Sequence, residues 1–216
     1  MTRTLHCKGI ERHVSNLDRA LAEISAIRGQ MARASEFRGY GPATFAATGL
    51  LAVAAAVGQA VWLKDPAAHV PAYLGLWIGV ATVSAALIGF EMVTRSRRMH
   101  SDLAGEMIRA AVEQFLPAAA AGVLITAVLC RFAPQSLGLL PGLWQIVFGL
   151  GVFASCRFLP RAMVLVGVWY LAAGLAALVF CGDARAFSPW IMGAGFGIGQ
   201  GLVALVLQRG VGGHDE

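Results

Sequence analysis

Long apolar stretches separated by short polar linkers make up most of this sequence. A helix needs about 20 apolar residues to cross the roughly 30 Å hydrocarbon core of a bilayer. Six stretches approach or exceed that length, at Ala43–Leu63, Val70–Val93, Phe115–Phe132, Leu139–Phe158, Ala162–Cys181 and Pro189–Gln208. The pattern predicts an all-α fold, a bundle of about six transmembrane helices over residues 42–208. A cytoplasmic N-terminal segment, residues 1–41, precedes it, and a cytoplasmic tail, residues 209–216, follows it.

Proline and aromatic residues support this segmentation. Proline lacks the backbone N–H, so it is tolerated at a helix start but breaks a helix interior. All eight prolines fall at or near the ends of the predicted helices. Amphipathic rings gather at the level of the lipid headgroups, and four aromatic residues near segment ends are expected there: Trp62, Tyr73, Trp144 and Trp190.

Composition and charge place these helices in a membrane and give them a direction. Apolar residues make up 57% of the chain and charged residues only 13%, whereas about 25% of the residues in soluble proteins are charged. The segments between successive spans lie alternately on the two sides of the membrane. Fourteen of the 17 Lys and Arg residues fall in the segments on the same side as the two termini. Only Lys64, Arg131 and Arg185 fall on the other side. The positive-inside rule therefore predicts that both termini are cytoplasmic.

The basic residues cluster beside apolar runs, which favours lipid headgroups over nucleic acid as their partners. Arg95, Arg97 and Arg98 directly follow the second predicted span, where we expect them to contact headgroups. We expect no direct nucleic acid binding. The linker that contains them, Thr94–Gln114, has the spacing of a helix with one weakly apolar face, into which the second membrane helix is able to continue.

The N-terminal segment carries a heptad pattern, which predicts an amphipathic helix. Its apolar positions alternate four- and three-residue spacings, with Arg28 in one slot: Ile10, Val14, Leu17, Leu21, Ile24 and Met31. One interpretation is a helix that lies on the membrane or on the protein's own loops. The other is a coiled coil with a second copy or a cytoplasmic protein partner, through Leu17, Leu21 and Ile24. Three heptads are marginal alone, so a coil would need membrane tethering as help.

The last predicted helix is rich in glycine. It is not a phosphate loop, because no strand precedes it and no P-loop lysine follows. Gly193, Gly197 and Gly201 fall on one helical face, while Gly195 and Gly199 fall on another. Small residues at every fourth position let helix backbones approach closely in lipid. The first face is predicted to pack on a neighbouring helix; the alternative is a flexible helix that lines a substrate path.

Polar residues inside the spans are few, and each is a candidate for function because burying it is costly. Glu91 is the one carboxylate. It either pairs with Arg95, four residues later, or forms a proton or cation site. Gln59, Gln145 and Gln200 can hydrogen-bond between helices, and the last two are the better candidates for lining a polar cavity.

The residue constellations of common enzymes and metal sites are absent from the sequence. It has no nucleophile-elbow, zinc-protease or Walker motif, and no two histidines are placed to hold a haem between spans. We therefore predict no catalytic residues, no metal and no cofactor. Cys130 and Cys181 end two spans on the same side, where they form either a disulfide or, as we favour, two small apolar contacts.

Two strings resemble a group of uncharacterised six-helix inner-membrane proteins of bacteria. They are FRGYGPATFAATGLL at Phe37–Leu51 and LPGLWQIVFGLGVFASCRFLPRA at Leu140–Ala162. The resemblance covers most of the chain. It implies a location in the bacterial inner membrane and an association with small winged-helix regulators, and it brings no activity and no catalytic residues.

Three functional hypotheses follow from these patterns. The first is a non-enzymatic membrane module that binds a partner or relays a signal through its N-terminal helix and second loop. The second is a small-solute transporter or channel, which requires a polar cavity between the fourth and sixth spans. The third, a membrane enzyme or redox subunit, has no residue that argues for it.

Overall fold

Proline marks the first turn of most helices in the computed structural model, which describes residues 41–99, 102–156, 159–180 and 185–212. The proline ring fixes φ near the helical value at a position that needs no N–H donor. The described elements are α2 (Pro42–Trp62), α3 (Val70–Met99), α4 (Asp102–Phe132), the short 3-10 helix η1 (Pro134–Leu139), α5 (Leu140–Ser155), α6 (Met163–Phe180) and α7 (Pro189–Gly212). All of the described elements are helical.

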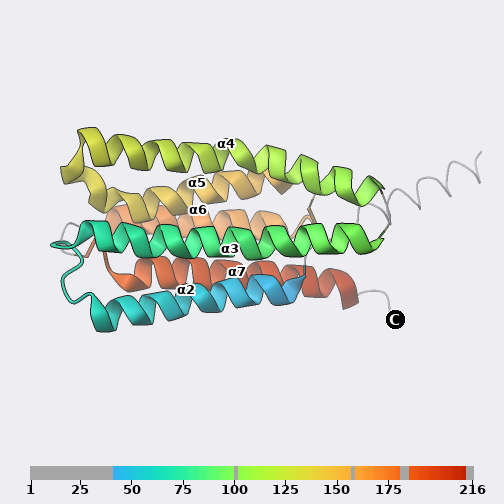
Figure 1. The fold of residues 1–216 in the computed structure, drawn as a ribbon, viewed down its shortest axis with the longest axis horizontal. Coiled ribbons are helices and arrows are strands. Elements are labelled where there is room, and N and C mark those ends of the chain that lie inside the picture. The colour runs from blue at the N-terminus through green and yellow to red at the C-terminus, as the bar shows by residue number, and fades with distance from the viewer. Residues whose placement is uncertain (1–40, 100–101, 157–158, 181–184, 213–216) are drawn as a thin grey trace, which may run out of the picture. The chain divides into compact units, whose positions relative to one another are not determined.

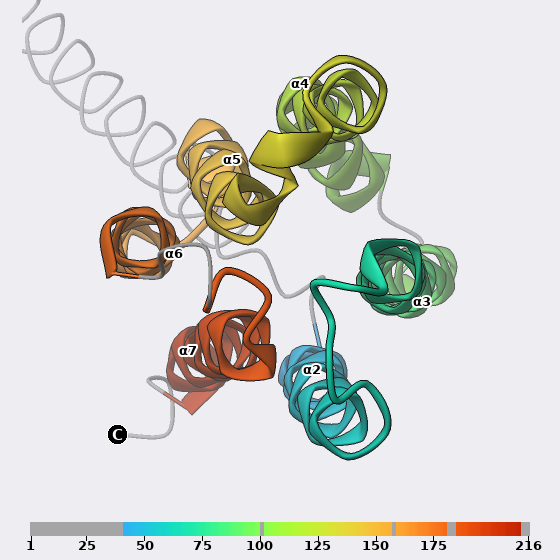
Figure 2. The same cartoon turned by 90° about the vertical axis from the view of Figure 1, so that its left-hand side faces the viewer.

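The helices run up and down, and their order around the bundle follows their order in the chain (Figure 1; Figure 2). Helix α7 packs against α2 on one side and α6 on the other, and α5 packs between α4 and α6. The most extensive pairings are α2 with α7 and α5 with α6, whereas α3 and α4 touch only sparsely. Residues 37–216 form one unit through these contacts.

Five of the described helices are long and apolar enough to cross a membrane, and α6 is a shorter apolar helix. The 18 residues of α6 span about 27 Å at 1.5 Å per residue, close to the roughly 30 Å of a bilayer core. Large apolar side chains such as Leu50, Phe90 and Val123 are exposed on the outer faces of the bundle. Water would disfavour so much exposed apolar surface. The apolar helices indicate a multi-pass membrane protein, and the all-α prediction is confirmed for the described residues.

The polar linker after the second predicted span is helical almost throughout. Helix α3 continues to Met99 and α4 begins at Asp102. As a consequence Pro117 lies inside α4, so the expectation that every proline marks a helix end is wrong here. Pro117 removes one backbone hydrogen bond, and membrane helices tolerate such a loss because neighbouring groups satisfy the freed carbonyl.

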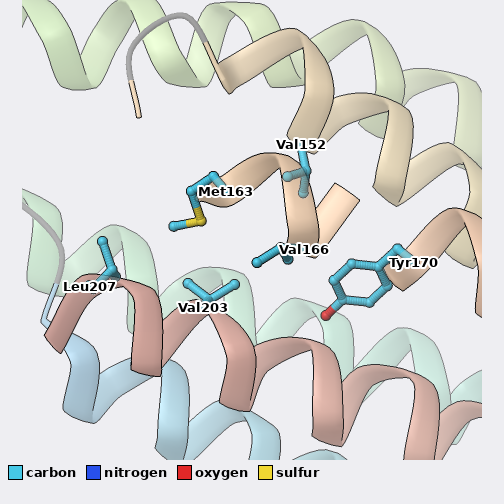
Figure 3. Packing of buried hydrophobic residues seen from close by; sticks show 6 residues of the cluster. All are labelled: Val152, Met163, Val166, Tyr170, Val203 and Leu207. Atoms are coloured by element: carbon cyan, nitrogen blue, oxygen red, sulfur yellow. The ribbon is translucent and has the colours of Figure 1, made fainter. Parts of the chain in front are cut away.

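Two clusters of buried side chains form the core. The first joins α5, α6 and α7 (Figure 3) through Val152, Met163, Val166, Tyr170, Val203 and Leu207. The second joins α2, α3 and α7 through Ala52, Ala56, Tyr73, Trp77 and Met192. Both clusters include residues of α7, which thus belongs to the core on two sides.

Two of the four aromatic residues expected at the headgroups lie inside the bundle instead. Tyr73 is fully buried, with its ring 5.0 Å from that of Phe187. Trp144 is half-buried, and its Nε1 donates a hydrogen bond to Thr126 Oγ1 at 2.8 Å. Both side chains turn inward because a polar or aromatic neighbour is available there. Trp62 and Trp190 are exposed, at the ends of α2 and α7 that lie together.

Candidate functional site

Gln145 projects from α5 against the backbone of α7 and is only 1% exposed. Its Nε2 donates a hydrogen bond to the carbonyl oxygen of Ile191 at 3.1 Å. That bond fixes the orientation of the amide, because only the nitrogen can donate to a carbonyl. The Oε1 atom therefore faces Gly195, and it has no hydrogen-bond partner among the described residues.

Glycine at two positions of α7 lets polar side chains reach its backbone. A Cβ atom at Gly195 would collide with the Gln145 amide. One turn later, a Cβ at Gly199 would collide with the hydroxyl end of Tyr170, on α6. Residues four apart share a helical face, so Gln145 and Tyr170 approach the same face of α7 at successive turns.

The residue before Tyr170 adds a further contact with this face. Trp169 Nε1 donates a hydrogen bond to the carbonyl oxygen of Gly195 at 2.9 Å. Two α7 carbonyls, at 191 and 195, thus each accept a bond from a side chain of another helix. We call this group the polar seam: Gln145, Trp169 and Tyr170 against Ile191, Gly195 and Gly199.

Aromatic rings enclose the Tyr170 end of the polar seam. The ring of Tyr170 lies 4.6 Å from that of Phe148 and 5.3 Å from that of Phe196, measured between centroids. Its oxygen points toward α7 (Figure 3) and has no hydrogen-bond partner among the described residues. A buried hydroxyl without a partner costs about 1–3 kcal/mol, and hydrocarbon offers no solvent to reduce that cost.

Sequence reasoning missed Trp169 and Tyr170 as members of this site. The sequence places Gly195 and Gly199 on a second face of the last helix, which is the signal that could indicate this site. It does not identify the residues that meet that face. Which α6 residues meet the glycines depends on the rotation of α6 about its own axis. A run as uniformly apolar as α6 does not encode that rotation.

The other two glutamines lie apart from the polar seam. Gln59 is buried; its Nε2 donates to the carbonyl oxygen of Phe187 at 2.8 Å, and its Oε1 accepts from Trp77 Nε1 at 2.8 Å. Gln200 is buried beside Gly49 of α2, and its Oε1 has no partner in the described part of the chain. Gln200 therefore lies on the side of α7 that faces α2, whereas Gln145 reaches from α5 to the side that carries Gly195, so the two cavity candidates approach α7 on different faces.

The glycine face predicted to pack on a neighbouring helix lies against α2. A Cβ at Gly193 would collide with that of Ala56, and a Cβ at Gly197 would lie 2.7 Å from Val53 Cγ2. A Cβ at Gly201 would meet no heavy atom within 4 Å. Close approach thus requires glycine at the first two positions and leaves room at the third.

Glu91 lies half-buried near the end of the α3 span, and its backbone carbonyl accepts a hydrogen bond from Thr94 Oγ1 at 2.9 Å. The pairing predicted for it involves the side chain of Arg95, which lies outside the described residues. Other predicted contact residues also lie outside them, either entirely or in their side chains: Leu17, Leu21, Ile24, Arg97 and Arg98.

An exposed ion pair lies on the first turns of α4. Arg109 Nε donates to Glu113 Oε1 at 2.8 Å, and the two side chains are 82% and 59% exposed. The hydrogen bond and the charge of Glu113 raise the pKa of Arg109, so the guanidinium stays protonated. Both side chains lie on the surface of α4.

No metal centre accompanies these features in the described part of the chain: no three His, Cys, Asp or Glu side chains gather there in a way that could hold an ion. Cys130 is a free, exposed thiol, and its alternative disulfide partner, Cys181, lies outside the described residues.

No protein-family model, curated protein or solved structure matches this chain. The function of the chain is therefore inferred from its own residues and geometry.

Proposed function

We propose that this chain is a non-enzymatic module of the bacterial inner membrane. It crosses the bilayer six times with both termini in the cytoplasm. It binds a cytoplasmic partner through the α3–α4 hairpin together with the N-terminal helix. The partner is a second copy of the chain or a cytoplasmic protein, and the sequence resemblance adds small winged-helix regulators to the candidates.

The length of α3 and α4 beyond the membrane carries this proposal. The apolar windows of the two helices are Val70–Thr94 and Val112–Phe132, whereas the helices extend to Met99 and start at Asp102. The ten residues 102–111 of α4 alone add about 15 Å of helix. Both extensions lie at the same end of the bundle (Figure 1). A helical hairpin that leaves the lipid offers a surface on which a protein can dock.

Charge supports the cytoplasmic placement of this hairpin. The linker between α3 and α4 falls on the same side as the two termini, and that side carries 14 of the 17 Lys and Arg residues. Basic residues remain preferentially on the cytoplasmic side. Arg109 and Glu113 add exposed charges of both signs at the membrane-proximal end of the hairpin.

The contacts inside the bundle support a scaffold rather than a catalyst. Its buried polar side chains are neutral amides, hydroxyls and indoles, several of them bonded to a neighbouring helix. Gln59, for example, joins α2, α3 and the segment before α7 through two bonds. Such ties hold helices in a fixed arrangement, which is what a module that presents an external hairpin requires.

A small-solute transporter is the second candidate function. The unpartnered oxygens of Gln145, Tyr170 and Gln200 favour it, because they put hydrogen-bonding capacity inside the bundle. A solute path between α5 and α7 would need α7 to move away, because Gln145 is bonded to Ile191 and packed on Gly195. The hairpin requires no such movement, so the partner-binding module remains the better-supported function.

Site-specific photo-crosslinking tests the proposal in native membranes. A photoreactive amino acid at Arg109 reports on the hairpin, and the same probe at Val123, 69% exposed on the same helix, is the matched control within the span. We expect a discrete protein adduct from position 109 and none from position 123. We also expect deletion of residues 1–36 to weaken that adduct.

The mass of the adduct identifies the partner. Twice the mass of the chain indicates a second copy, and any other discrete mass indicates a different protein. If position 109 gives no protein adduct, or only the pattern of position 123, the hairpin is not a docking surface and the proposal fails.

A further inference from the structure

Two oxygens of the polar seam point at the bare backbone of α7 without a hydrogen-bond partner among the described residues. They are Gln145 Oε1 and Tyr170 Oη, and the two residues are 1% and 0% exposed. Gln145 is held by its bond to the Ile191 carbonyl, and Tyr170 is held among aromatic rings. Neither side chain can turn to solvent without breaking these contacts.

The two oxygens lie against successive turns of the same face of α7. Each oxygen lies over the Cβ position of a glycine, and Cβ positions four residues apart in a helix are separated by about 5–6 Å. One bridging oxygen with two hydrogen bonds of about 2.8 Å joins atoms that are about 4.5 Å apart, because the two bonds meet at a near-tetrahedral angle. Gln145 Oε1 only accepts, whereas Tyr170 Oη both donates and accepts. A hydroxyl group satisfies both atoms, because it donates to the first and bonds with the second.

We propose that the polar seam is a binding site for one hydroxyl group, from water or from a small alcohol-type solute. The hydroxyl bridges Gln145 Oε1 and Tyr170 Oη beside Gly195 and Gly199. The two glycines keep the α7 backbone free of side chains at the point where the ligand is held. This site does not depend on the hairpin, since it lies among α5, α6 and α7 and the hairpin is formed by α3 and α4.

A second buried tyrosine provides the matched control. Tyr73 is also fully buried, and its hydroxyl also has no partner among the described residues, but it belongs to the other core cluster. Thermal unfolding of Tyr170→Phe and Tyr73→Phe is compared with wild type in nanodiscs formed directly from native membranes, so that a bound solute is retained. Removing a hydroxyl that binds a ligand destabilises the protein, whereas removing an unpartnered one is neutral or stabilising.

We expect Tyr170→Phe to lower Tm by about 2–4 °C and Tyr73→Phe to leave it unchanged or raised. An unchanged or raised Tm for Tyr170→Phe would overturn the proposal. Equal losses in the two variants would also overturn it, because the effect would then not be specific to the polar seam.

A second measurement leaves the polar seam intact. The chain has three tyrosines, so Tyr40→Phe with Tyr73→Phe leaves Tyr170 as the sole reporter. Its ring C–O band in the infrared shows whether the hydroxyl is hydrogen-bonded. If the Tyr170 hydroxyl is hydrogen-bonded both in native membranes and after dialysis in nanodiscs, the ligand is water. If dialysis removes the hydrogen bond, the ligand is a small solute. A hydroxyl that is unbonded in both preparations overturns the proposal.

Discussion

At the residue scale, the interior tryptophans act as ties between helices. Trp77 donates to Gln59 Oε1, Trp144 to Thr126 Oγ1, and Trp169 to a carbonyl of α7. The indole N–H has no second function in these positions, and hydrocarbon cannot satisfy it. Each bond therefore selects one rotation of a helix that is apolar on all sides.

Gln59 provides the clearest test of this role. We expect Gln59→Leu to lower the stability by about 1–3 kcal/mol, because it leaves the Trp77 N–H and the Phe187 carbonyl without their partner. Thermal unfolding in nanodiscs measures the change. The control is Thr82→Val, whose hydroxyl bonds only within its own helix, to Ile78; it is expected to stay within about 0.5 kcal/mol. A Gln59→Leu variant as stable as this control would refute the role.

The sequence indicated which residues would be polar inside the bundle, but not how they pair. Gln59, Gln145 and Gln200 were identifiable because amides are rare in apolar runs. Their partners include backbone carbonyls, such as those of Ile191 and Phe187, which carry no residue-specific signal. The pairings depend on helix rotation and on tertiary packing, which is why they emerged only from the structure.

At the element scale, the glycines of the last helix face three neighbouring helices. Gly193 and Gly197 lie against α2, while Gly195 and Gly199 lie against polar side chains of α5 and α6. Small residues let backbones approach closely in lipid. Helix α7 can therefore pack closely on its neighbours along two faces.

A pair of identical substitutions tests the packing face. We expect Gly193→Ala to destabilise the bundle by about 1–3 kcal/mol, because the new methyl group collides with Ala56. Gly79→Ala on α3 meets no heavy atom within 4 Å and should stabilise the helix by up to about 1 kcal/mol. Unfolding in nanodiscs measures both changes. If the two variants shift stability in the same direction, α7 does not pack on α2 as described.

The presence of each helix was predictable because the length of an apolar run is a strong signal of a membrane-spanning helix. The predicted ends agree with α2, α5, α6 and the start of α7 to within about three residues, the usual uncertainty of such boundaries. The exceptions are the end of α3, at Met99 beyond the predicted Val93, and the start of α4, which lies well before the predicted Phe115. The first turns of α4 are polar, so a criterion based on apolar length omitted them, and Pro117 appeared to mark a start that lies elsewhere.

At the scale of the whole molecule, a membrane bundle with an external helical hairpin accounts for both the apolar surface and the long helices. The exposed apolar side chains need lipid, and the extensions of α3 and α4 need water. From the asymmetry of Lys and Arg we propose that those extensions lie in the cytoplasm. This arrangement is the central claim, because the partner-binding proposal requires it.

Cysteine labelling in spheroplasts tests that claim most directly. Single cysteines at Asp65, Gln135 and Arg109, in a background without the four native cysteines, are treated with a membrane-impermeant maleimide. All three positions are exposed. We predict that positions 65 and 135 are labelled in intact spheroplasts and that position 109 is labelled only after permeabilisation. Labelling of position 109 in intact spheroplasts, or protection of position 65, would contradict the account.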